Sequence, residues 1–304
     1  MSRVDAPAPP WRAGALLLPV ALAFGCHRAA PPSRFPTAEA ALERMHAAQA
    51  CSLGVTGEGS LDYFGPRGRV RANMLFLAML PARVRFDVYS PFGATLSTLT
   101  ADGERFGLLD LREKVFLRGP ANACNIRRFT GVPLPPHALV DLLRGVSPVL
   151  VHEPGAATID WEGGAYVVRI PSRHRAEQEI RFVPPEADYA LPWWEQRVRV
   201  LETSVTQAGV DLYRVELEGH AVANTAPPRE DPDQLEPPLP PSGPACRAEL
   251  PRRLRFVGET EGHDVVLVTR EIAHNPPLPP GVFTQSPPSG VSVRNATCPE
   301  DARP

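Results

Sequence analysis

Histidine, serine and carboxylate side chains could carry out catalysis, but they form no recognisable catalytic motif in this sequence. There is no Gly-x-Ser-x-Gly turn for a serine nucleophile, no phosphate loop ending in Lys-Ser or Lys-Thr, and no His-Glu-x-x-His. His174 and Glu177 are three residues apart, but residues 172–179 are typical of a charged turn that leads into a strand. Five further histidines are dispersed, with no carboxylate cluster beside them: His46, His152, His220, His263 and His274. We expect no enzyme, no cofactor and no metal site, although a site assembled from distant residues would leave no such motif.

The thiol of Cys26 is the group whose position indicates chemistry most clearly. Arg3 and Arg12 come first, residues 13–24 are apolar, and Gly25 directly precedes Cys26. A basic start, a short apolar run and a small residue are typical of an export signal, and the run is too short to cross a bilayer. A cysteine at this position can take a diacylglyceryl group on its thiol. Cleavage before it would free an amine for a further acyl chain, such as palmitate.

Residues 22–26 resemble the bacterial lipobox, although Ala23 stands where leucine is preferred and Phe24 where a small residue is preferred. The resemblance implies a signal peptide over residues 1–25 and a lipidated Cys26. The alternative is an ordinary cleaved signal with an incidental cysteine. His27 replaces the aspartate that retains many lipoproteins in the inner membrane, which favours the outer membrane, with the domain facing the periplasm. Two or three acyl chains anchor firmly, because each buried methylene contributes about 0.8 kcal/mol.

Four cysteines then remain in the mature chain: Cys51, Cys124, Cys246 and Cys298. An even number in an exported protein predicts two disulfides, and four cysteines allow three pairings. We favour Cys51 with Cys124 and Cys246 with Cys298, since each pair joins neighbours within one half of the sequence. A zinc or thiol-redox site is the weaker alternative, because there is no Cys-x-x-Cys.

Residues 74–80 form the most unusual apolar stretch, in which alternation gives way to apolar side chains on both faces. One interpretation is a central strand packed on both sides. The other is an apolar cavity or a membrane contact, in which flexible methionines adapt to the bound group. The candidate residues are Met74, Leu75, Phe76, Leu77, Met79 and Leu80, joined by Val84, Phe86 and Val88 on the next strand.

Trp193 and Trp194 are a second candidate for the same role. Paired tryptophans can lie at a membrane interface or at the mouth of a cavity. In a β-rich protein such a pair is more often packing at the rim of the sheet.

Composition limits the elements that can position these residues. The 32 basic and 34 acidic side chains give a net charge of −2, so binding to nucleic acid through phosphates is disfavoured. The 37 prolines argue against a helical bundle, because proline interrupts helices. No period of 20 to 50 residues indicates a repeat protein.

The hydrophobic pattern predicts a mainly β fold of about eleven antiparallel strands with two helices. Thr37 is a candidate N-cap for a helix over residues 38–50, and Pro136 suits the first turn of a helix over residues 135–143. Alternation of period two predicts hairpins from residue 53 to about 118. Further strands are expected from residue 157 to 222 and from 252 to 272.

Two segments resemble the LolB-like outer-membrane lipoproteins. Residues 84–93, Val-Arg-Phe-Asp-Val-Tyr-Ser-Pro-Phe-Gly, are similar to a family strand that ends in a Ser-Pro-Leu-Gly-like turn. Residues 133–136, Pro-Leu-Pro-Pro, and residues 139–145, Leu-Val-Asp-Leu-Leu-Arg-Gly, are similar to a later short helix that ends in Leu-Leu-x-Gly. The resemblance implies an α+β, mainly β fold, a half-open barrel like those of LolA and LolB in which helices lid an apolar cavity. It also implies a loop with an apolar tip residue, for which Leu75, Leu77 and Leu80 are candidates.

The expected organisation is a lipidated, flexible tether over residues 26–36 and one domain over 37–274. A proline-rich insertion at 226–251 and an extended proline-rich end at 275–304 complete the chain. The resemblance implies a non-catalytic monomer that binds acyl chains or lipoprotein cargo, with a periplasmic carrier protein as a further partner. The alternative is a structural or assembly-factor lipoprotein that binds a protein partner with the same fold, through the insertion.

Overall fold

The structure is a computed structural model that describes residues 28–65, 68–131, 133–230, 233, 237–258 and 262–298. Within these ranges the chain forms many strands, three α-helices and two single-turn 3-10 helices. The helices are α1 (Ala38–Ala48), α2 (Ala123–Thr130), α3 (Pro136–Leu143), η1 (Arg173–Arg175) and η2 (Glu186–Asp188). The strands of the first half are β1 (Gly54–Gly65), β2 (Gly68–Met79), β3 (Arg83–Tyr89), β4 (Thr95–Ala101), β5 (Arg105–Asp110) and β6 (Val115–Pro120). Those of the middle are β7 (Thr158–Glu162), β8 (Ala165–Pro171), β9 (Ala176–Val183), β10 (Arg199–Gln207), β11 (Val210–Glu218) and β12 (Ala221–Val222). The last are β13 (Glu249–Leu250), β14 (Arg253–Gly258), β15 (His263–His274) and β16 (Ser292–Asn295).

One large sheet holds fourteen of the described strands, in the order β16-β6-β5-β4-β3-β2-β1-β15-β14-β11-β10-β9-β8-β7. Neighbours are antiparallel except for β16, which is parallel to β6. The end strands β16 and β7 do not pair with each other, so the sheet is not closed. The mainly β fold is confirmed, but the expected count of about eleven strands is too low. β16 lies in the proline-rich end of the chain, where no alternation marks a strand.

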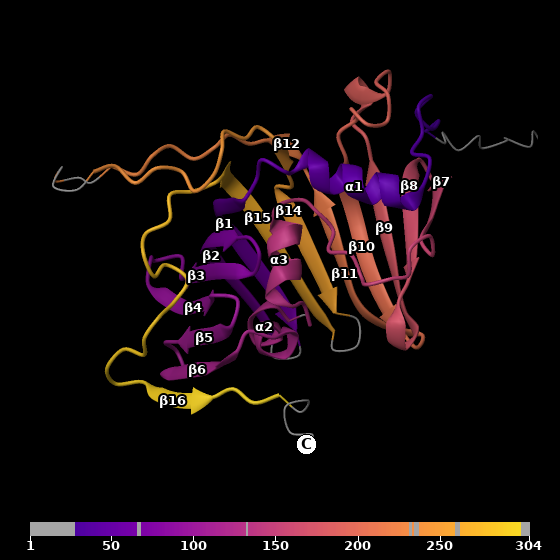
Figure 1. Ribbon diagram of the computed structural model, residues 1–304. Coiled ribbons are helices and arrows are strands. Elements are labelled where there is room, and N and C mark those ends of the chain that lie inside the picture. Colours follow the sequence, from indigo (N-terminus) through magenta and orange to yellow (C-terminus); the bar gives the residue numbers. More distant parts are fainter. Residues whose placement is uncertain are drawn as a thin grey trace, which may run out of the picture.

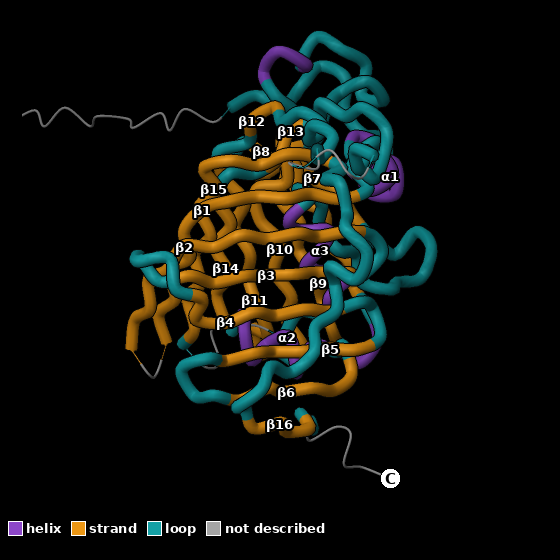
Figure 2. The backbone as a smooth tube through the Cα atoms, turned by 90° about the vertical axis from the view of Figure 1, so that its left-hand side faces the viewer, coloured by secondary structure: helices purple, strands orange, loops and turns teal. Residues whose placement is uncertain are grey.

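The sheet curves around the helices. Figure 1 shows α3 and α2 on one face of the sheet and α1 across the upper ends of its strands. Figure 2 shows β1 to β6 side by side from the opposite, outer face. We call the sheet surface that carries α2 and α3 the inner face, and the opposite sheet surface the outer face.

Local sequence explains the three helices. The Thr37 hydroxyl accepts a hydrogen bond from the Ala40 amide at 3.2 Å, so Thr37 caps α1 as expected. In α3, Pro136 lies in the first turn, where its missing amide hydrogen costs nothing. The short helix α2 was not expected from the sequence. Its cap is Asn122, whose side chain accepts from the Asn125 amide at 3.0 Å.

The proline-rich end of the chain covers part of the outer face. Gln285 donates to the carbonyls of Thr98 and Gly107, and Arg85 donates to the carbonyl of Val282. The segment then adds β16 to the edge strand β6. Its last described residue is Cys298, which is bonded to Cys124 at the start of α2.

Both disulfides join distant parts of the sequence, Cys51 to Cys246 and Cys124 to Cys298. The expected pairing of sequence neighbours was wrong. Because β15 returns along the whole of β1, the last part of the chain lies beside the first part. Proximity along the sequence is therefore a poor guide to proximity in this fold.

Candidate functional site

The inner face of β2 and β3 holds five of the apolar candidates from the sequence. Cross-strand pairing places Met74 opposite Val88, Phe76 opposite Phe86, and Ala78 opposite Val84, so all share one face. All of these side chains are buried. Except for Val88, they belong to one apolar core that continues through β1, β14 and β15 to the helices α2 and α3.

The remaining candidates of the 74–80 stretch lie elsewhere. Leu75 and Leu77 alternate onto the outer face, where Leu75 is 42% exposed and Leu77 is half-buried. Met79 and Leu80 lie at the β2–β3 turn, Met79 at the edge of burial and Leu80 packed partly against the core. The side chains of residues 74–78 therefore do alternate between the two faces of β2. The sequence is continuous in apolar residues because the partly exposed outer face also carries leucines.

A small apolar pocket lies where α2 and α3 meet the inner face. Its walls are side chains of β1, β3, β14, β15 and both helices: Leu61, Phe86, Phe129, Leu139, Phe256, Val265 and Leu267. The space open to the centre of a water molecule is only about 10 Å³. Small-molecule pockets typically have about 300–1,000 Å³, so the expected open cavity is absent from this part of the structure. The half-buried aromatic ring of Phe129 forms one wall of this pocket, with its centroid 5.3 Å from that of Phe86.

A polar junction holds α3 to the end of α1. Arg144, directly after α3, is buried and donates to the carbonyls of Ser52 at 2.6 Å and Gln49 at 3.2 Å. It also pairs with Asp141 at 3.1 Å. Burial raises the pKa of the Asp141 carboxyl, an effect that the charge of Arg144 opposes.

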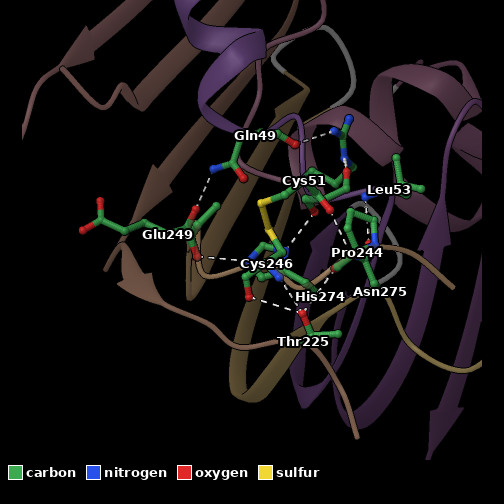
Figure 3. Close-up of a disulfide and its surroundings, with 12 residues drawn as sticks. Gln49, Cys51, Leu53, Thr225, Pro244, Cys246, Glu249, His274 and Asn275 are labelled. Atoms are coloured by element: carbon green, nitrogen blue, oxygen red, sulfur yellow. Dashed lines mark hydrogen bonds between the residues drawn. A yellow bond between two sulfur atoms is a disulfide. The ribbon is translucent and has the colours of Figure 1, made fainter. Parts of the chain in front are cut away.

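The disulfide Cys51–Cys246 lies within the same junction (Figure 3). Asn275 donates to the carbonyls of Cys51 and Pro244 and accepts from the Leu53 amide at 2.8 Å. His274 makes hydrogen bonds through both ring nitrogens, to Ser52 Oγ and to the Ala248 carbonyl. These contacts satisfy both ring nitrogens of His274 and the side-chain amide of Asn275, and they give His274 a structural role.

The tryptophan pair is not part of the pocket. Trp193 and Trp194 lie in the β9–β10 connection, at the strand ends near α1. The Trp193 ring packs 5.8 Å from Phe35 and 5.7 Å from Trp194, and Trp194 is 56% exposed. The structure therefore separates the two groups of apolar candidates.

Sequence reasoning missed one prominent apolar residue, Phe92. It lies at the tip of the β3–β4 turn and is 97% exposed. The implied tip residues Leu75, Leu77 and Leu80 do not occupy such a position. An aromatic side chain between proline and glycine in a tight turn, where polar residues are usual, is the signal that could have identified it.

A wider cleft of about 520 Å³ lies on the outer face, between the β3 and β4–β5 ends and residues 278–284. Charged side chains and proline line it: Arg83, Asp102 and Glu104 face the segment that carries Pro279 and Phe283. Arg83 lies over the Phe283 ring, 5.5 Å from its centroid. This cleft shares no residue with the apolar pocket.

Cys26, the predicted lipidation site, lies outside the described residues. Among the residues that the structure does describe, no three metal-ligating side chains cluster. In the same ranges, no helix is both long and apolar enough to span a bilayer.

Comparison with known proteins gives likenesses of backbone only. No family model and no curated protein matches the chain. A LolA superfamily protein from Nitrosomonas europaea is 10% identical with a TM-score of 0.49, covering 82% of this chain and 98% of that one. A DUF1329 family protein from Desulfovibrio piger is 9% identical with a TM-score of 0.49, covering 81% and 96%. A domain assigned to an outer membrane lipoprotein-sorting protein from Vibrio parahaemolyticus is 12% identical with a TM-score of 0.47, covering 80% and 95%.

Proposed function

We propose that this protein is a non-catalytic lipoprotein, anchored through Cys26 in the outer membrane, that binds acyl chains or lipoprotein cargo under α2 and α3. The observation that carries the proposal is the apolar pocket between the inner face and the helices α2 and α3. Seven apolar side chains line this pocket, and no charged side chain does. The motif resemblance to LolB-like lipoproteins supports the same assignment.

Binding requires the two helices to move, because the pocket in its present state holds about one water molecule. Phe129 and Leu139 would leave the inner face, and an alkyl chain would replace their contacts. Burial of apolar surface contributes about 25 cal/mol per Å². The bound alkyl chain would therefore offset the free-energy cost of the apolar area that opening exposes.

The attachments of the helices favour such a movement. The disulfide Cys124–Cys298 holds the start of α2, and Arg144 holds the end of α3. Between these two fixed points lies the pocket-covering segment, with Phe129 and Leu139 on its inner side. Opening would bend this segment outward between its two ends while the sheet keeps its shape.

Equilibrium binding of a fluorescent fatty acid to the mature chain carrying Cys26→Ser tests this proposal. We expect saturable binding that Phe129→Asp weakens at least tenfold, because the new charge faces an apolar pocket. Val265→Phe, which fills the pocket without a charge, should weaken binding in the same way.

Phe92→Asp is the matched control, since it places the same charge at an exposed aromatic position and should leave binding unchanged. Circular dichroism would verify that each variant is folded. Absence of saturable binding to the parent protein would refute the proposal.

A second candidate function is protein binding through the proline-rich insertion. The backbone of Arg229 and Leu239 pairs at 2.9 and 2.8 Å, and Figure 1 shows this orange arm extending away from the sheet. The closed interior favours this candidate, because a packed core with a projecting arm needs no cargo inside. Two results together would support protein binding over acyl-chain binding. The fatty-acid titration would show no saturation, and deletion of residues 228–240 would abolish binding of a protein partner.

A further inference from the structure

The first described residues are docked on the domain, although a flexible tether was expected there. The Arg28 carbonyl accepts from the Trp161 indole at 3.1 Å, and its guanidinium pairs with Glu186 at 3.1 Å. The same guanidinium lies 4.8 Å from the centroid of the Tyr189 ring. The chain is thus fixed from Arg28 onward to β7 and to the β9–β10 connection.

Phe35 anchors the other end of this docked segment. Its buried ring packs in edge contacts, 5.1 Å from Tyr166 and 5.6 Å from Phe182. Ser33 also accepts from the Trp193 amide at 2.9 Å, and the Gln196 side chain donates to the Ser33 carbonyl. Several backbone and ring contacts therefore determine where residues 28–36 run.

The docking limits where the lipid anchor can be. Cys26 is two residues before Arg28, and consecutive Cα atoms are about 3.8 Å apart, so the two Cα atoms are separated by at most about 7.6 Å. Acyl chains on Cys26 must therefore enter the membrane close to Arg28 and Tyr189.

The surface beside this point has the chemistry of a membrane interface. Trp194 is the most exposed aromatic residue there, at the same β9–β10 connection that holds Arg28. Tryptophan and tyrosine favour the headgroup level of a bilayer, because one end of the ring is apolar and the other polar. The charges there are mixed, since Arg28 pairs with Glu186 and Glu195 is exposed. Contact would depend on the aromatic rings and the anchor, with little attraction to anionic lipid.

We propose that the β9–β10 end of the domain, through the exposed Trp194, lies against the phospholipid surface that holds the acyl chains of Cys26. This inference rests on the lipidation in the proposed function and adds a fixed orientation to it. The β3–β4 turn with Phe92 lies at the opposite ends of the strands, since β3 leaves the end near α1 and β10 begins there. Phe92 therefore lies outside the proposed membrane contact.

Tryptophan fluorescence of the lipidated protein, reconstituted in vesicles of phosphatidylcholine with brominated acyl chains, tests the orientation. The tryptophans after Gly25 are Trp161, Trp193 and Trp194. We expect quenching that Trp194→Phe reduces at least twofold. In that background, Phe92→Trp should add a fluorophore that the brominated lipid does not quench.

A longer connection to the anchor is the second variant. About fifteen Gly and Ser residues inserted between His27 and Arg28 would span roughly 20 Å, leaving every described contact in place. If the short connection sets the orientation, this insertion should lower the quenching of Trp194 at least twofold. Unchanged quenching would overturn the role of the short connection.

Mass spectrometry of the mature amino terminus distinguishes failure of the proposed orientation from failure of the proposed lipidation. An acylated Cys26 together with an unquenched Trp194 would overturn the orientation and leave the proposed function standing. Quenching of the indole that Phe92→Trp introduces, again with Cys26 acylated, would have the same meaning. An unacylated Cys26 would overturn both the anchor and the orientation.

Discussion

A charged side chain buried at the end of α3 explains how this helix is held. Arg144 donates to two backbone carbonyls and to Asp141, so its charge is compensated on several sides. The sequence did not single out Arg144, because an arginine before a helix-ending glycine is also typical of an exposed helix end. Its burial depends on residues 49–52, which are distant in sequence.

We expect Arg144→Ala to lower the free energy of unfolding by about 3 kcal/mol, since breaking a buried pair leaves its partners unsatisfied. Urea denaturation followed by circular dichroism would measure the change. Arg169→Ala is a matched control, because Arg169 pairs with Glu162 at the surface and should cost about 0–1 kcal/mol. Equal effects of the two substitutions would contradict the role of Arg144.

His220 makes stability depend on pH. Burial lowers the pKa of its ring from 6.5 to about 4, and the nearby charge of Arg199 acts in the same direction. The folded state therefore keeps His220 neutral while the unfolded state takes up a proton below about pH 6.5. Stability is fully present above that pH and is lost as the pH falls toward 4.

Between pH 7 and pH 5 this group should remove about 2 kcal/mol from the free energy of unfolding. His220→Gln should remove this part of the pH dependence and leave the contribution of the acidic residues. Denaturation curves of both proteins at the two pH values would show it. Parallel losses of stability in variant and parent would contradict this assignment.

Among the elements, α2 marks the limit of sequence reasoning. The helices α1 and α3 have clear cap or proline signals, and both were expected nearly where they lie. The eight residues of α2 include two arginines and an asparagine, and its short apolar side consists mainly of Ile126 and Phe129, which is too little to predict a helix. Contacts of Phe129 and Ile126 with the core, and a covalent bond to the distant Cys298, hold α2 in place.

Removal of this bond should loosen α2 selectively. In the double variant Cys124→Ser and Cys298→Ser, we expect amide hydrogen exchange in α2 and β16 to rise at least tenfold, with β1 and β15 unchanged. Cys51→Ser with Cys246→Ser is the matched comparison, since it frees the junction at α1 and leaves α2 attached. Uniform protection of α2 in both variants would show that the disulfide does not hold the helix.

For the whole molecule, hydrophobic pattern predicted the class of fold but not its interior. Alternating strands and the scarcity of helix signals indicated a large antiparallel sheet, which the structure shows. The state of the interior depends on which side chains the helices contribute. Phe129 belonged to no expected helix, so its ring could not be placed inside, and an open cavity was expected where the structure is packed.

At this scale the proposed lipid anchor at Cys26 would determine the membrane location of the protein. Cys26→Ala should release the protein from membranes into the soluble periplasmic fraction, because the acyl chains supply most of the membrane affinity. Fractionation with immunoblotting would measure the release. Full retention of the variant in membranes, with no acyl mass on the parent protein, would refute lipidation.

The crossed pairing of the cysteines has a consequence for biogenesis. In the proposed export, the thiols of the mature domain would emerge in the order Cys51, Cys124, Cys246 and Cys298, and each disulfide of the structure skips one of them. An oxidase that joins thiols as they appear would link Cys51 to Cys124 first and so lock in a non-native loop. Correct maturation therefore demands either delayed oxidation until β15 has paired with β1, or a disulfide isomerase that reshuffles the early product.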